Sequence, residues 1–273
     1  MLGKLIKHEF RATGRIMLPL FLAVLILSAF AGLSIYGFER ARDVRILQAV
    51  YGTTIGTFFL SLFAVAVVAV VLMIQRFYKS LLRDEGYISM TLPVSVDAHI
   101  WAKLLTSFAW FALEAILSAL AVGVVLSINV SLRDDLWIWD IFEEFRLYFE
   151  DLRGFNAVLY GIEYLVLSFL GACAFCLRCY ASMAIGHSAA NHKLLLSFLT
   201  WFAIGVALRM IGSVIFAGIF FSDMYWNYLD TFTVGADDTA HLFLVSTILG
   251  FALQDVVFYF LTRYFMKNKL NLP

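Results

Sequence analysis

Four ionisable residues stand inside long apolar segments of the chain: Glu114, Glu163, Arg209 and Asp255. A charge at membrane depth costs on the order of several kcal/mol unless it is paired or hydrated, so such residues mark functional sites by default. Two interpretations stay open: ion pairs that hold helices together, or a water-filled substrate path. Glu114, Arg209 and Asp255 fall near mid-membrane and Glu163 in the outer third. Arg209 keeps its charge, so we predict that it faces protein and contacts one of the three carboxylates.

Cysteine and histidine residues are further candidates for chemistry. Cys173, Cys176 and Cys179 imitate part of an iron–sulfur spacing, but they lack a fourth ligand and share one apolar segment, which favours packing. His187 and His192 occupy a short polar turn and lack the spacing of a zinc protease, which indicates a solvated loop or a partner contact. We expect no metal site and no cofactor in this chain.

Only one pattern suggests catalysis. Gly32-Leu-Ser34 resembles a Gly-x-Ser nucleophile, and His241 falls at the same outer boundary, so an intramembrane hydrolase is kept as an alternative. The sequence contains no G-x-x-x-x-G-K-[ST] phosphate loop, so ATP would have to be hydrolysed in a partner chain. We expect that the chain is not an enzyme and has no catalytic residue.

Membrane-spanning helices must position these groups. The 273 residues are 62% hydrophobic and only 15% charged, whereas a soluble domain needs roughly 25% charged residues. Apolar runs reach the roughly 20 residues that cross a bilayer core. We predict a single all-α membrane domain, residues 1–273, with Pro19 in the first turn of its first span. The six predicted spans are Arg15–Tyr36, Thr53–Ile74, Ile100–Ile128, Phe155–Cys179, Leu194–Phe221 and His241–Arg263.

The distribution of Lys and Arg predicts the orientation of the chain in the membrane. With the N-terminus inside, 13 Lys and Arg flank the cytoplasmic ends of the spans and 6 flank the other ends. Short loops obey the positive-inside rule, so both termini are predicted to be cytoplasmic. The net charge is zero, which gives no argument for binding nucleic acid.

Two flanking segments have amphipathic patterns. Residues 1–14 place basic side chains opposite apolar ones, which predicts an interfacial helix on cytoplasmic lipid headgroups, or a simple basic flank. Glu9 interrupts the apolar stripe, so it should pair with a basic neighbour or face a protein partner. Residues 129–154 predict an extracellular amphipathic helix, either structural or a lid.

The segment 76–99, between the second and third predicted spans, is the most informative. Basic residues recur at helical spacing at its start, and apolar residues lie between them. Gly86 could end this helix in a left-handed conformation, and Asp97 could cap the next helix. The pattern predicts a docking surface for a cytoplasmic partner.

The run RFYKSLLRDEGYISMTLPVS, which starts at Arg76, resembles ABC-2-type permease subunits of bacterial ABC transporters, especially those of Firmicutes. The opening LIKHEFRATGRIMLPL and Lys103 resemble the same family, so the motifs cover about 35 residues. The resemblance implies a multi-pass permease of the bacterial plasma membrane, acting as an exporter, with a separate ATPase subunit and an identical or different second permease. The residues that it implies for coupling to the ATPase are Tyr78, Lys79, Arg83, Asp84, Glu85 and Gly86.

An ion- or proton-coupled secondary transporter is the main alternative. In it, Glu114, Arg209 and Asp255 would relay ions, and no ATPase would be needed. A repeat between the two halves of the chain would favour this alternative, and the sequence contains none that we can recognise.

Overall fold

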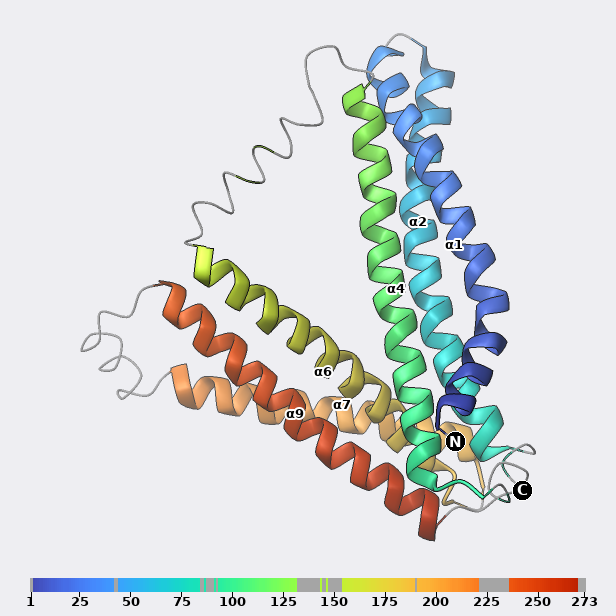
Figure 1. The fold of residues 1–273 in the computed structure, drawn as a ribbon, viewed down its shortest axis with the longest axis vertical. Coiled ribbons are helices and arrows are strands. Elements are labelled where there is room, and N and C mark those ends of the chain that lie inside the picture. The colour runs from blue at the N-terminus through green and yellow to red at the C-terminus, as the bar shows by residue number, and fades with distance from the viewer. Residues whose placement is uncertain are drawn as a thin grey trace. The chain divides into compact units, whose positions relative to one another are not determined.

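The computed structural model describes residues 2–41, 44–83, 86, 91, 93–131, 143, 146, 154–189, 191–220 and 236–269. These residues form long α-helices, drawn in Figure 1, and one short π-helical turn, Tyr78–Leu82. The α-helices are α1 (Leu2–Arg40), α2 (Arg45–Phe77), α4 (Val96–Ser131), α6 (Gly154–Gly186), α7 (Lys193–Phe220) and α9 (Ala236–Asn268).

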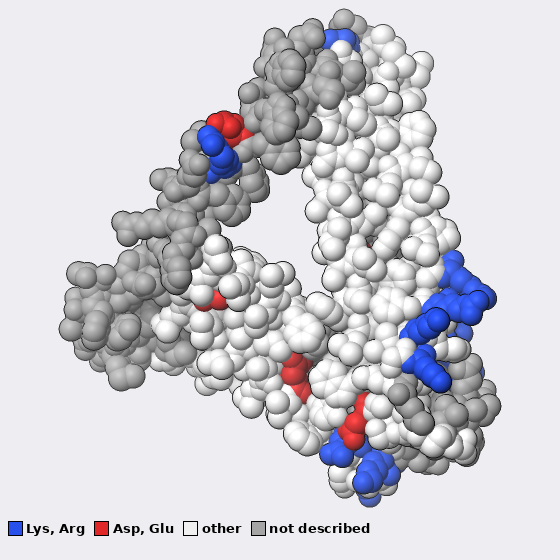
Figure 2. Space-filling view, viewed as in Figure 1, with Lys and Arg blue, Asp and Glu red and all other residues white. Residues whose placement is uncertain are grey.

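The prediction of six helices able to cross a membrane is confirmed. Within the described residues, six helical stretches of 23 to 38 residues are long and apolar enough to span a bilayer. Figure 2 shows the visible sides of these helices as mostly uncharged, with Lys and Arg gathered near helix ends. Most of these helices extend beyond the predicted spans, whereas α7 agrees with its predicted span to within one residue at each end.

The first helix shows this extension most clearly. The helix α1 runs for 39 residues without a break at Gly14, so residues 2–14 are not a separate helix. Pro19 consequently lies inside the helix, and its predicted place in the first turn is wrong. The predicted helix over 129–154 lies largely outside the described residues.

The chain divides into two compact units. The first comprises residues 1–73 and 101–157, and the second comprises residues 74–100 and 158–273. The assignment of the whole chain to one permease domain stays a prediction.

In the first unit, α1, α2 and α4 pack along their lengths (Figure 1). Their buried residues recur mainly at intervals of seven or four: Met17, Val24 and Ala31 in α1; Phe58, Val65 and Ala69 in α2; Trp110, Leu117, Ala121 and Val125 in α4. This spacing is that of helices packed side by side with a slight left-handed crossing.

In the second unit, the C-terminal half of α6 is the most buried element. Its residues Cys176, Tyr180, Ala181 and Ala184 are fully enclosed. The other helices of this unit, α7 and α9, contribute Ser197, Phe258 and Met266 to the buried set. The connection between α2 and α4 belongs to this unit as well, so its side chains can pack on α6 and α9.

Candidate functional site

The segment that leads from α2 to α4, residues 77–97, is called the coupling segment after the role that the ABC-2 resemblance implies for it. At its start, the ring of Phe77 stacks on the ring of Tyr180 in α6, with 4.1 Å between centroids and 7° between planes. Phe77 and Tyr180 are both 0% exposed, and Leu81 and Leu82 are also buried. Burial of such side chains stabilises a fold by about 1.5–3 kcal/mol each. The segment is therefore anchored in the second unit by its apolar residues.

The helix widens where these apolar residues enter the core. Residues Tyr78–Leu82 form a π-helical turn, a feature frequent at functional sites, and Arg83 then adopts an extended conformation. The predicted end of this helix at Gly86 is wrong. The helix ends four residues earlier, because Arg83 already leaves the helical region. Asp84, Glu85 and residues 87–90 lie outside the described residues.

The far end of the coupling segment is anchored by polar contacts. Tyr259 of α9 donates a hydrogen bond from its hydroxyl to Asp97 Oδ1 at 2.6 Å, and Arg263 Nε lies 2.9 Å from the same oxygen. The backbone N–H of Ala98 donates to Ser95 Oγ at 3.3 Å. Ser95 is therefore the cap of α4, and the predicted capping role of Asp97 is wrong because its carboxylate is directed to α9.

The turn between α6 and α7 contacts the coupling segment directly. The ring of Tyr78 meets the imidazole of His187 edge to face, at 5.2 Å between centroids. His187 is 2% exposed, and its Nδ1 lies 2.9 Å from the carbonyl oxygen of Met183. The predicted solvated position of His187 is wrong, because the turn folds its imidazole inward against Tyr78.

Gly186 makes this turn tight enough for the contact. A Cβ atom at Gly186 would lie 2.5 Å from the backbone nitrogen of Ser197 and 2.6 Å from its Cα atom. Backbone atoms cannot move aside like the end of a flexible side chain, so only glycine fits.

We expect Gly186→Ala to lower the stability of the protein by about 1–3 kcal/mol, because overpacking forces backbone shifts. The thermal midpoint of unfolding in mild detergent measures the effect. The matched control is Gly161→Ala in the same helix, where a Cβ atom would meet nothing within 4 Å. Equal midpoints for the two variants would contradict the expectation.

The environment of His187 lowers its pKa below the ordinary value of 6.5, mainly because burial penalises the charged imidazolium. The hydrogen bond to the Met183 carbonyl raises the pKa, and the nearby positive charge of Lys193 lowers it further. The folded protein therefore holds this imidazole neutral at a pH where the unfolded chain begins to protonate it.

This difference makes part of the stability pH-dependent. Because the folded pKa is the lower one, the contribution of His187 is complete above pH 6.5 and is lost as the pH falls below that value. We expect acidification from pH 7.5 to 5.5 to lower the thermal midpoint less in His187→Gln than in the wild type. His192→Asn, at an exposed position of the same turn, should keep the wild-type pH dependence.

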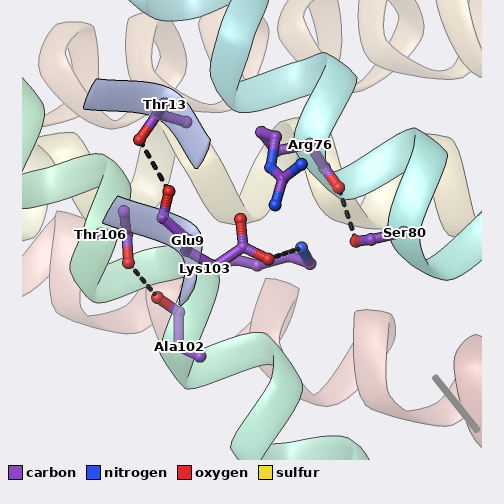
Figure 3. A network of polar contacts seen from close by, with 7 residues as sticks. All are labelled: Glu9, Thr13, Arg76, Ser80, Ala102, Lys103 and Thr106. Carbon is purple, nitrogen blue, oxygen red and sulfur yellow. Dashed lines mark hydrogen bonds and ion pairs between the residues drawn. The ribbon is translucent and has the colours of Figure 1, made fainter. Parts of the chain in front are cut away.

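A second polar network lies in the first unit, where α1 meets α4 (Figure 3). Lys103 Nζ forms an ion pair with Glu9 Oε1 at 2.8 Å, and the side chains are only 4% and 13% exposed. Trp110 Nε1 donates to Thr13 Oγ1 at 2.7 Å, and that hydroxyl donates to the carbonyl of Glu9 at 2.9 Å. The prediction that Glu9 pairs with a basic neighbour is confirmed.

The charged candidates within the helices are arranged differently from the prediction. Arg209 lies on an exposed side of α7 and makes no ion pair with Glu163 or Asp255, the acids of its own unit. Glu163 instead lies 2.9 Å from Nδ1 of His241, and Tyr160 stacks on that imidazole at 4.0 Å. Of the three carboxylates predicted to contact Arg209, these two do not.

Asp255 and Glu114 remain without a described partner. Both carboxylate oxygens of Asp255 are shielded from solvent and have no hydrogen-bond partner among the described residues. Glu114 belongs to the other unit from Arg209, so the pairing of these two stays a prediction. Cys173, Cys176 and Cys179 are buried and free, which fits packing between helices.

The hydrolase alternative needs a nucleophile beside His241. Its Nδ1 is taken by Glu163, and its Nε2 is buried with no hydrogen-bond partner among the described residues. A general base must lie within hydrogen-bond reach of the proton it abstracts, although that geometry can tighten on substrate binding. This geometry gives the hydrolase alternative no support.

Sequence reasoning missed three sets of contacts: those of Asp97 with α9, the pair of Glu163 and His241, and the stack of Phe77 on Tyr180. Tyr259 and Arg263 are four residues apart on one face of α9, and this spacing could have indicated a shared acidic partner. Glu163 and His241 both fall near the N-terminal ends of their helices, α6 and α9, so a similar distance from the helix start could have suggested their pairing. No pattern in the sequence indicates the stacking of Phe77 on Tyr180.

Compared with protein-family models, curated proteins and solved structures, the chain matches none.

Proposed function

We propose that the chain is the transmembrane permease subunit of an ABC exporter of the bacterial plasma membrane. In this proposal the helices form the substrate path together with a second permease, identical or different. A separate ATPase subunit supplies the energy and docks on Tyr78, Lys79, Arg83, Asp84, Glu85 and Gly86. The chain itself holds no cofactor.

The observation that carries the proposal is the construction of the coupling segment. Its apolar residues are buried against α6, and its end at Asp97 is hydrogen-bonded to α9. Lys79 and Arg83, in contrast, are exposed. A linker that only joins two spans does not need to be packed on other helices. A segment that transmits movement of a bound ATPase to the spans must be fixed to them. This geometry supports the ATPase-coupled function, and the resemblance of the same residues to ABC-2 permeases agrees with it.

Purification of the tagged chain from its host in mild detergent tests the proposal. We expect an ATPase with a phosphate-binding loop to co-purify, identified by mass spectrometry. The double variant Lys79→Glu with Arg83→Glu should lose this ATPase and its transport-coupled ATP turnover.

The control reverses two exposed charges elsewhere, Lys267→Glu with Lys269→Glu at the end of α9, and should retain the ATPase. Full ATP turnover in the Lys79 and Arg83 double variant would exclude the coupling segment as the docking site.

The proposed orientation gives a separate expected result. With native cysteines replaced by alanine, Cys introduced at Asn191 should react with impermeant reagents only from the cytoplasm, and Cys at Asp237 only from outside. Asn191 lies just before α7, and Asp237 lies in the first turn of α9, after the chain has passed through α7. Labelling of both positions from one side would therefore overturn the orientation.

A secondary transporter is the second candidate, and the carboxylate of Asp255, which has no hydrogen-bond partner in the described part of the chain, favours it. Such a protein would need no ATPase, and protons or ions would bind at Asp255 during transport. In proteoliposomes without ATP, an imposed proton gradient should then drive transport, and Asp255→Asn should abolish it. The absence of gradient-driven transport would exclude this candidate.

A further inference from the structure

Arg178 carries a charge inside the membrane-spanning helix α6 and packs on aromatic rings. Its guanidinium carbon lies 4.8 Å from the centroid of the Trp201 ring in α7 and 6.0 Å from that of Phe175. Its Nε atom is shielded from solvent and has no hydrogen-bond partner among the residues that the structure describes. A guanidinium has five N–H donors, and stacking on a ring satisfies none of them.

The guanidinium of Arg178 lies far from the ends of the helices. Its Nη1 atom lies 4.0 Å from the position that a Cβ atom of Gly205 would take. Gly205 is near the middle of α7, which has 28 residues, and is roughly 18 Å from the start of that helix. Long helical side chains point toward the N-terminus of their helix, so Arg178 extends away from the α6–α7 turn. The charge is therefore placed inside the apolar core of a bilayer and not at its surface.

The acids of the second unit do not neutralise Arg178. Glu163 is paired with a histidine, and Asp255 has no hydrogen-bond partner in the described part of the unit. Arg209 follows Gly205 by one helical turn on α7 and is exposed. Two arginines from two helices therefore lie on either side of Gly205, and no acid described in this unit forms an ion pair with either.

Gly205 leaves space beside these arginines. Among the described atoms, the one within 4 Å of a Cβ atom placed there is Nη1 of Arg178. Exposed apolar side chains precede and follow this position on α7: Phe198, Phe202 and Val206. Moving a small anion without a tail to this depth costs a large desolvation free energy. An amphiphile keeps its tail on the apolar side chains, and its anionic group then meets the arginines.

We propose that Arg178 and Arg209 bind the anionic group of an amphiphile, a phosphate or a carboxylate, beside Gly205. The planar fork of arginine matches such a group with two parallel hydrogen bonds, and the Trp201 ring holds one fork in place. This inference goes beyond the proposed function. It concerns a ligand that binds without an ATPase, so it can fail or hold independently of that function.

Equilibrium binding of radiolabelled dodecyl phosphate to the purified chain in an uncharged detergent tests the inference. We expect saturable binding in the wild type. Arg178→Gln should raise the dissociation constant at least about 10-fold, because it removes hydrogen bonds between charged groups. Arg209→Gln should raise it at least about 3-fold. Lys267→Gln removes an exposed charge at the end of α9 and should change it less than about 2-fold.

A second variant leaves both arginines in place. Gly205→Leu fills the space beside Nη1 and should weaken binding as much as Arg178→Gln does. The matched control is Gly212→Leu in the same helix, where a Cβ atom would meet nothing within 4 Å, and it should bind like the wild type. The thermal midpoint of each variant in the same detergent shows that it is folded. Wild-type affinity in Arg178→Gln or in Gly205→Leu would overturn the inference.

Competition with unlabelled compounds identifies the source of the ligand. Displacement of the probe by phosphatidylglycerol would mean that the site takes an anionic membrane lipid. Failure of phosphatidylglycerol to displace it would mean that the site takes an anionic amphiphile with a single chain, as a cargo could be. Phosphatidylcholine, which has no net charge, should displace the probe at least about 10-fold less well than the anionic compounds do. Equal displacement by phosphatidylcholine or by inorganic phosphate would contradict recognition of an anionic amphiphile.

Discussion

Lys103→Met should destabilise the protein by up to about 3–5 kcal/mol, because it removes the cation paired with the largely buried carboxylate of Glu9. The two side chains are 4% and 13% exposed and lie 2.8 Å apart, so water cannot replace the lost partner well. Unfolding by denaturant in mixed micelles, followed by tryptophan fluorescence, measures the change in free energy. Trp110 lies in the same network and reports on it directly.

The double variant Glu9→Gln with Lys103→Met distinguishes loss of the pair from loss of packing. Removing both charges should recover part of the stability, because no uncompensated charge remains. Recovery should be incomplete, since Glu9 and Lys103 both take part in further polar interactions. Lys7→Met, at an exposed position of the same helix, is the control and should change little. A double variant no more stable than Lys103→Met would contradict the importance of the charge pair.

A second large effect is expected at Phe77, where alanine should lower the free energy of unfolding by about 3–5 kcal/mol. The substitution leaves a cavity beside Tyr180, whose ring is fully buried on the opposite side of the stack. Phe77→Leu refills most of that cavity and should cost less than half as much. The same unfolding measurement applies.

Phe59→Ala is the matched control for Phe77, because that ring is 61% exposed on α2. A comparable loss at Phe59 and Phe77 would show that the stack with Tyr180 has no special role. A selective loss at Phe77 would show that the start of the coupling segment depends on α6 for its stability.

The number of helices and their approximate positions follow from the sequence, because apolar length alone selects segments that can cross a bilayer. Helix ends were harder to predict. Residues 2–14 continue α1, since their amphipathic pattern has the same helical period as the span itself. Gly86 was predicted to end a helix that ends instead after Leu82, where buried apolar residues anchor the chain.

Within the site, the sequence indicated which side chains need partners but not which partners they find. Which polar side chains meet between two helices depends on how each helix is rotated about its axis, and a single sequence does not determine that rotation. Glu9 was expected to pair and does, with Lys103. Arg209 was expected to contact Glu114, Glu163 or Asp255. Instead α7 directs it to an exposed side, and His241 takes Glu163.

The repeated spacing of buried residues in α1, α2 and α4 has a mechanical consequence. Side chains that interlock at intervals of seven or four residues cannot slide along one another by less than about 6 Å, the rise of four helical residues, and fit again. Any smaller axial shift between α1 and α4 would separate Trp110 from Thr13 and Lys103 from Glu9. A tilt of all three helices together breaks none of these contacts. Under force, the three helices of the first unit should therefore tilt together as one rigid body and should not slide along one another.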